Sequence, residues 1–247
     1  MLSIRESAMS AFPILMYHQV DAIAPKYGAD GARARHRGLT VPVGQFARQM
    51  GLLKALGYRG VSMSDLMPYL RGEKRGKVVG ITFDDGYRNN LTNALPVLRR
   101  YGFSSTCYVV SGLVGATNTW DRKNHVVEKP LMTADEVREW IAAGQEVGSH
   151  TCHHVDLREV HGEAAKAEIQ GSKAQLEALT CVPCRHFCYP YGSYRSEHVG
   201  LVREAGYESA TTTVPGRAGG EGELLELPRI GVFKGTLLPK FFWGIRS

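Results

Sequence analysis

Apolar segments rich in β-branched and aromatic residues alternate with amphipathic segments along most of the chain. The strand-like segments are residues 14–17, 58–61, 78–83, 105–110, 146–149, 186–189, 209–213 and 227–232. The helix-like segments are residues 43–56, 64–70, 88–101, 133–143, 163–179 and 197–205. Thr133 and Glu136 match a capping box, which predicts a helix start. Strands that alternate with helices form parallel sheets, and roughly seven or eight such units fit one closed or nearly closed barrel.

We expect one domain over residues 1–247, with its packed core over about residues 13–232. A chain of 247 residues fits one barrel, which commonly takes roughly 200–250 residues. No internal repeat, low-complexity linker or change of composition divides the sequence. Residues 25–38 and 112–130 lack a periodic pattern and are predicted to be long loops. Loops at the carboxyl ends of barrel strands carry the chemistry, so both are candidate walls of a substrate site.

The chain is basic, with 30 Lys and Arg against 24 Asp and Glu and a net charge of +6. Much of the positive charge lies in two clusters, at residues 33–37 and 71–77. We interpret both clusters as solvated loops, the usual setting of charge runs. The alternative is attraction to an anionic partner, such as a phosphate-bearing lipid, a nucleotide sugar or a nucleic acid. No nucleic-acid-binding motif supports the last of these, so we expect no such partner.

The composition and the first ten residues indicate where in the cell the protein is expected to be. Hydrophobic residues make up 43% of the chain, but no apolar run approaches the ~20 residues of a membrane helix. Residues 1–10 lack the apolar core of a signal peptide. The five cysteines, an odd number, are expected to be free thiols in a reducing compartment. We therefore predict a cytoplasmic protein without a membrane span.

Two adjacent carboxylates, Asp84 and Asp85, follow the apolar segment at residues 78–83 and precede Gly86. A turn or a helix cap would explain Asp85 alone. Asp84 then adds a second negative charge beside it, and like charges repel. A bound cation removes this repulsion. We therefore expect Asp85 to bind a metal ion, with Asp84 beside the water that the ion activates.

A histidine cluster follows the strand-like segment at residues 146–149. His150 and His154 are four residues apart, so one helical turn would bring both rings to one side. Imidazole nitrogens are good zinc ligands. His153 competes with His154, since its spacing from His150 is three. Two imidazoles and a carboxylate with an open fourth position would form a catalytic metal site; a packed or exposed histidine is the alternative for each ring.

The third polar segment comprises residues 186–192, where an apolar run leads into Pro190, Tyr191 and Gly192. The end of a strand and a turn explain this pattern on their own. The functional interpretation adds a backbone N–H directed into the site and an aromatic wall for a sugar ring.

Together these segments resemble the polysaccharide deacetylase family, also called the NodB-homology group or carbohydrate esterase family 4. Thr82-Phe-Asp-Asp-Gly86 looks like the first family motif, and His150-Thr-Cys-His-His154 looks like the second. Phe187-Cys-Tyr-Pro-Tyr-Gly192 looks like a variant of the third. Leu227-Pro-Arg-Ile230 and Leu15-Met-Tyr-His18 are similar to segments of a bacterial subgroup. The resemblance covers nearly the whole chain.

The resemblance implies a distorted (β/α) barrel with about seven parallel strands, a divalent metal ion, usually zinc, and hydrolysis of an acetyl group from a carbohydrate. By motif position, Asp85, His150 and His154 would bind the metal, and Asp84 would be the general base. The metal would lower the pKa of its water and polarise the acetyl carbonyl. The backbone N–H of Tyr191 would help to stabilise the oxyanion. We expect an N-linked rather than an O-linked acetyl group.

Two positions depart from the family pattern. Many members have an arginine in the third motif that tethers the catalytic base, and Cys188 stands at that position here. We expect Arg229 to take that role. Many members also have a late histidine that acts as the general acid, whereas no histidine follows His198 in this chain. His18 is our candidate substitute, with a structural hydrogen bond as its alternative role.

Tyr191 and Pro190 of the third motif, with Trp120 and Asp121 of the second long loop, are the candidate substrate-binding residues. The expected partner is an N-acetylated carbohydrate, either lipid-linked or nucleotide-linked, because a cytoplasmic enzyme does not meet mature cell wall. A catalytically silent, glycan-binding barrel is one alternative, and it would bind no metal. A metal hydrolase of a small non-sugar amide is another, and a closed pocket rather than an open groove would favour it.

Overall fold

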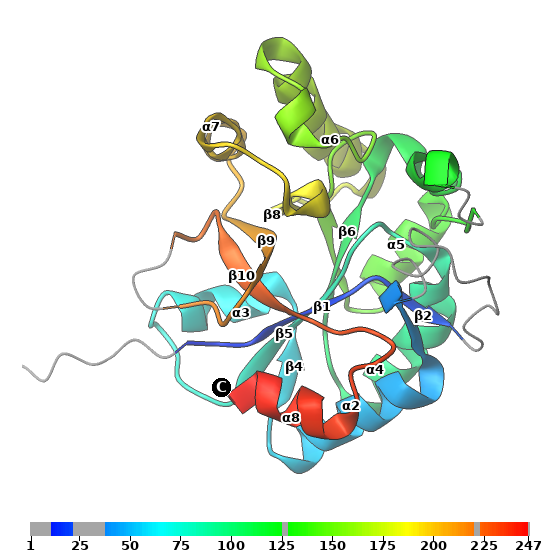
Figure 1. Ribbon diagram of the computed structural model, residues 1–247, viewed down its shortest axis with the longest axis vertical. Coiled ribbons are helices and arrows are strands. Elements are labelled where there is room, and N and C mark those ends of the chain that lie inside the picture. The colour runs from blue at the N-terminus through cyan, green and yellow to red at the C-terminus, as the bar shows by residue number, and fades with distance from the viewer. Residues whose placement is uncertain (1–10, 22–37, 125–127, 220–222, 247) are drawn as a thin grey trace, which may run out of the picture.

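The computed structural model describes residues 11–21, 38–124, 128–219 and 223–246, and its main feature is a closed ring of seven parallel strands (Figure 1). In spatial order the ring is β1 (Ile14–Tyr17), β10 (Leu227–Gly231), β9 (Ser209–Pro215), β8 (His186–Cys188), β7 (Glu146–Ser149), β6 (Thr106–Val109) and β5 (Val78–Phe83). The ring closes because β5 pairs in parallel with β1. The predicted barrel of about seven parallel strands is therefore confirmed.

Two features of the strands were not predicted. β4 (Arg59–Val61) pairs only with the first half of β5, so it lies outside the closed ring. β2 (Gln19–Asp21) and β3 (Thr40–Pro42) form a separate two-stranded sheet, also parallel. β2 and β3 lie outside the segments that we predicted to be strands, because three residues each are too few to show a period of two.

Helices follow most of the strands and cover the outside of the ring (Figure 1). They are α2 (Val43–Ala55), α3 (Met63–Leu70), α4 (Leu95–Tyr101), α5 (Ala134–Ala142), α6 (Gly162–Thr180), α7 (Ser196–Glu204) and α8 (Leu238–Arg246). The predicted capping box is present, since Thr133 and Glu136 each accept a hydrogen bond from the other's backbone N–H. The helix expected over residues 88–101 begins instead with a π-helical turn, Asn90–Ala94. Such turns occur often beside functional sites.

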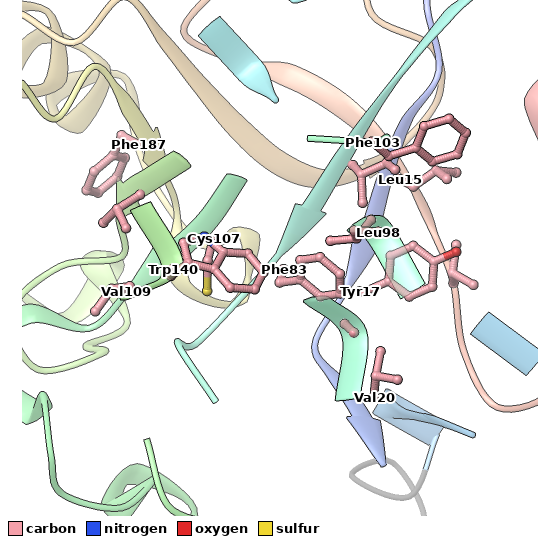
Figure 2. Close-up of a cluster of buried hydrophobic side chains, with 14 of the residues drawn as sticks. Leu15, Tyr17, Val20, Phe83, Leu98, Phe103, Cys107, Val109, Trp140 and Phe187 are labelled. Carbon is pink, nitrogen blue, oxygen red and sulfur yellow. The ribbon is translucent and has the colours of Figure 1, made fainter. Parts of the chain in front are cut away.

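The main core fills the space between the ring and these helices. Figure 2 shows Phe83 of β5 between Tyr17 of β1 and Trp140 of α5, with ring-centroid distances of 5.6 and 6.0 Å. Every residue of β5 is buried, as expected for a parallel strand with both faces covered. The core also includes Phe241 and Ile245 of α8, which lies beside α2. It therefore extends beyond the limit near residue 232 that we expected.

The basic cluster at residues 71–77 is an exposed loop, in agreement with its interpretation as a solvated segment. The other basic cluster, at residues 33–37, and the chain start at residues 1–10 lie outside the described residues. All five cysteines are free. Within the described ranges, no helix has the length and apolar character needed to cross a membrane.

Candidate active site

The predicted site residues gather at one end of the barrel. Because the strands are parallel, their carboxyl ends meet at the same face of the ring. His18 follows β1, Asp84 and Asp85 follow β5, and His150 follows β7. Tyr191 follows β8, and Arg229 is part of β10. Residues that are far apart in the sequence are thus brought together by the closure of the ring.

Arg229 holds Asp84 in a buried, bidentate ion pair. Its Nη1 lies 2.7 Å from Oδ1 of Asp84, and its Nη2 lies 2.7 Å from Oδ2. The guanidinium also donates to the Thr212 carbonyl, the Thr82 hydroxyl and the Cys188 sulfur. Arg229 as a whole is only 1% exposed. Two parallel bonds fix the orientation of a carboxylate as well as its position, which is the tether that we expected from Arg229.

The ion pair sets the charge of Asp84. Burial alone would raise the pKa of this carboxyl group, but the charge and hydrogen bonds of Arg229 outweigh burial and hold the pKa below its ordinary value. Asp84 is therefore an ionised carboxylate at neutral pH, and an ionised carboxylate can accept a proton.

Asp85, His150 and His154 form a second buried cluster beside this ion pair. Oδ1 of Asp85 lies 3.4 Å from Nε2 of His150 and 3.2 Å from Nε2 of His154. One ligand atom from each residue lies within 4.8 Å of the other two. His153 points elsewhere: its Nδ1 bonds Glu168 at 2.7 Å and its side chain is 61% exposed. The geometry thus joins His154, and not His153, to Asp85 and His150.

A tight turn, and not the helical turn that we predicted, brings His150 and His154 to one side. Thr151 and His154 have φ values of 64° and 57°, in the left-handed region. Glu168 of α6 stabilises the turn, because it accepts hydrogen bonds from the backbone N–H groups of Cys152 and His153 at 2.9 Å each. The prediction of a helical turn was wrong, because the four-residue spacing of the two histidines does not show that Glu168 of α6 stabilises a different turn between them.

Backbone strain is concentrated at this site. Among the described residues, five non-glycine residues have a positive φ, and four of them are Asp85, Thr151, His154 and Tyr191. Left-handed backbone is unfavourable for such residues and persists where the surrounding structure imposes it. After Tyr191, Gly192 has a φ of 68°, and an added Cβ would lie 1.9 Å from Oγ1 of Thr213. The third motif therefore requires glycine at this position.

The donor set fits a divalent metal ion such as zinc. Nδ1 of His150 lies 2.8 Å from the carbonyl oxygen of Cys188, which turns Nε2 toward Asp85. Burial lowers the pKa of His154 despite its bond to Asp85, and this favours the neutral ring that a metal needs. Burial would likewise lower the pKa of His150, but nearby negative groups raise it. A coordinated cation would take the place of that proton.

His18 follows β1 and lies near the carboxylate of Asp84. Its Nε2 is 3.9 Å from Oδ2 of Asp84, beyond hydrogen-bond distance, and its side chain is 16% exposed. Asn90, in the π-helical turn, donates to the backbone carbonyl of His18 at 2.8 Å. Nδ1 of His18 has no hydrogen-bond partner among the described residues. The ring is thus positioned through its backbone and lies next to Asp84.

Aromatic side chains cover His154. Trp120 stacks on its ring with a centroid distance of 4.3 Å and an angle of 24°. Tyr191 contacts the same ring edge-on at 4.5 Å, and its own side chain is 52% exposed. Asp121 is half-buried and accepts a hydrogen bond from Asn118 at 2.8 Å, and Pro190 is buried. Of the four candidate substrate-binding residues, Trp120 and Tyr191 thus lie directly against the histidine cluster.

The sequence analysis did not identify several residues that hold the site residues in place. Thr82 had a readable signal, because a strand residue two positions before Asp84 points to the same face. Cys188 was noted only as a departure from the family pattern, yet its sulfur contacts Arg229 and its carbonyl contacts His150. Glu168 gave no signal, since it belongs to a helix that follows the histidine turn.

Comparisons with known proteins agree with this geometry. Residues 71–210 match the model of the polysaccharide deacetylase family. The Bacillus subtilis protein YxkH, named as a polysaccharide deacetylase, is 27% identical over 234 residues, which cover 94% of this chain and 75% of that protein. A poly-beta-1,6-N-acetyl-D-glucosamine N-deacetylase of Staphylococcus epidermidis is 23% identical over 193 residues, 75% of this chain and 65% of that enzyme.

The fold agrees as well. The crystal structure of a protein of Bacillus anthracis, also named as a polysaccharide deacetylase, superposes with a TM-score of 0.78 and 28% identity. The alignment covers 96% of this chain and 69% of that one. The family match spans more than half of the chain and includes Asp84, Asp85, both clustered histidines and Tyr191. With a family match over more than half of its length and the same barrel fold, this chain belongs to the polysaccharide deacetylase family.

Proposed function

We propose that this chain is a metal-dependent hydrolase that removes N-linked acetyl groups from a carbohydrate. One observation carries the proposal: an ionised, arginine-held carboxylate, Asp84, directly precedes Asp85, which faces two imidazoles. A proton acceptor beside a set of metal ligands is the arrangement that hydrolysis by an activated water requires. A glycan-binding barrel without catalysis would need neither group.

Asp85, His150 and His154 would hold the metal ion, with zinc the expected one. When bound, the ion would act as a Lewis acid, which polarises the acetyl carbonyl and makes a nearby water more acidic. The three side chains are buried and close together, which supports this assignment. The carbonyl of Cys188 supports it further, because it fixes the ring orientation of His150.

Asp84 would act as the general base, accepting the proton of the water that attacks the acetyl carbon. Arg229 keeps the carboxylate ionised and limits its rotation. The ring of His18 lies 3.9 Å from the carboxylate of Asp84, and it would donate a proton to the departing nitrogen. An amide needs this protonation more than an ester does, because an amine anion is a poor leaving group. The backbone N–H of Tyr191 would stabilise the oxyanion.

The exposed aromatic surface supports a carbohydrate substrate. Tyr191 and Trp120 lie against His154, so a sugar ring stacked on them would bring its substituents close to the ligand cluster. Asp121 and Pro190 adjoin these two residues in sequence and complete the proposed substrate-binding set. The relative from Staphylococcus epidermidis is named for an N-acetylated polysaccharide, which supports the same class. A lipid-linked or nucleotide-linked substrate and a cytoplasmic location stay predictions.

Metal content is the first test. Purified wild-type protein should contain about one zinc-like ion per chain, and both His150→Ala and Asp85→Ala should lose it. His153→Ala is the matched control and should keep the ion, because His153 faces Glu168 instead. Wild-type protein that stays free of metal after incubation with zinc would contradict the metal-dependent mechanism and favour a binding role.

Acetate release is the second test. Wild-type protein with zinc should release acetate from N-acetylglucosamine oligosaccharides. Asp84→Asn should keep the metal and lose this activity, since it removes the proton acceptor and spares the ligands. Equal acetate release by wild type and Asp84→Asn would exclude Asp84 as the general base.

A further inference from the structure

A second set of metal-binding groups overlaps the one described above. Asp84, His150 and Cys188 each offer a ligand atom within 4.8 Å of the other two, and all three residues are buried. This set shares His150 with the first, and its carboxylate belongs to the proposed base. An ion in the second set would therefore occupy the group that must accept a proton.

Donor chemistry alone does not choose between the two sets. A thiolate, an imidazole and a carboxylate form a zinc or cobalt site at least as readily as one carboxylate with two imidazoles. Cys188 would give up its thiol proton to solvent when a metal binds, as cysteine ligands do. Another feature of the structure must keep an ion away from these three residues.

Arg229 is placed to do so. Its Nη2 lies 2.7 Å from Oδ2 of Asp84 and 3.2 Å from Sγ of Cys188, so one nitrogen contacts two of the three donors. Its Nη1 contacts the other oxygen of Asp84, and its Nε is bound to the carbonyl of Thr212. A buried guanidinium with this many partners is fixed in place, and its permanent positive charge repels a metal cation.

We propose that Arg229 excludes metal from Asp84, His150 and Cys188, and thereby directs the ion to Asp85, His150 and His154. The role is distinct from orienting the base, because it concerns where the metal binds. It rests on the proposed function only in taking Asp85, His150 and His154 as the catalytic set. Removal of the guanidinium should convert Cys188 from a contact of Arg229 into a metal ligand.

Cobalt(II) reports this change directly, because a thiolate–cobalt bond gives an intense near-ultraviolet charge-transfer band and nitrogen or oxygen ligands do not. Wild-type protein with excess Co²⁺ should show no such band. Arg229→Ala and Arg229→Gln should both show it, and the double variants with Cys188→Ser should lose it. Arg71→Ala, which removes an exposed arginine paired with Glu208, is the matched control and should resemble wild type.

Two results would overturn the proposal. The first is that Arg229→Ala or Arg229→Gln, shown by circular dichroism to be folded, binds Co²⁺ without the band. The second is that wild-type protein shows the band and Cys188→Ser does not; this comparison leaves Arg229 in place. Failure of the proposed function is distinct: wild-type protein would then bind no Co²⁺, while a cysteine-dependent band in the Arg229 variants would still support the exclusion role.

Discussion

Arg229 of β10 and Asp84, which follows β5, form two parallel 2.7 Å hydrogen bonds although they are 145 residues apart in the sequence. The contact exists because β1 pairs with both β5 and β10 when the ring closes. Asp84 and the two histidines follow β5 and β7, but Arg229, which orients Asp84, belongs to β10, the last strand of the ring in sequence. The base is therefore complete only in the closed barrel, which ties the proposed activity to the integrity of the whole ring.

Arg229→Ala should lower the free energy of unfolding by about 3–5 kcal/mol, because it leaves the Asp84 charge buried without its partner. Urea denaturation at neutral pH measures this loss. Arg71→Ala is a suitable comparison, since its ion pair with Glu208 is solvent-exposed, and about 1 kcal/mol or less is expected there. Equal effects of the two substitutions would mean that the buried pair adds no special stability.

A partly buried carboxylate, Glu146 at the start of β7, contacts residues of three other elements. It accepts hydrogen bonds from the Ser64 backbone N–H and the Thr106 hydroxyl, and it lies 3.4 Å from Nε2 of His186. Burial alone would raise the pKa of Glu146, but His186, Ser64 and Thr106 together lower it from 4.5 to about 2. The folded protein thus binds this proton less readily than the unfolded chain does.

Stability should fall with acid in a way that depends on Glu146. The contribution, roughly 3 kcal/mol by proton linkage, is fully present above the unfolded pKa and is lost as the pH falls from about 4.5 toward 2. Urea unfolding at several pH values in this range should give a shallower pH dependence for Glu146→Gln than for wild type. Glu139→Gln, at an exposed position of α5, should run parallel to wild type. Parallel curves for Glu146→Gln would contradict the assigned shift.

The barrel and the polar residues at its strand ends could be predicted from the sequence. Other features could not, for physical reasons. The six-residue strand β5 is a continuous apolar run, which indicates a buried strand, whereas the three-residue strands β2 and β3 form no such run. Asp84 and His150 were readable because each directly follows an apolar strand, and Asp85 because it adjoins Asp84. The contacts of Cys188 and Glu168 were not readable, because they depend on how distant elements pack and leave no local pattern.

His18→Gln tests the proposed proton donor. A general acid donates its proton to the departing group, and the amide of glutamine cannot replace imidazole in that role. The variant should have a pH profile of kcat/KM that differs from that of wild type, with kcat lower by about 10²–10⁴-fold. His153→Gln provides the control, because this histidine is exposed and paired with Glu168; its profile should match wild type. An unchanged profile in His18→Gln would remove His18 from the mechanism.

Trp120→Ala separates two roles of the indole that stacks on His154 at 4.3 Å. If the stacking orients the ring for metal binding, zinc affinity should fall by roughly 10-fold, as it does when groups that support metal ligands are removed. If the indole also forms part of the sugar site, KM should rise in zinc-saturated enzyme. Trp120→Phe, which keeps an aromatic face, should recover most of both losses. Trp243→Ala, at a position of α8 that is 68% exposed, is the matched control and should change neither quantity. Wild-type zinc affinity and KM in Trp120→Ala would show that the stacked indole serves neither the metal nor the substrate.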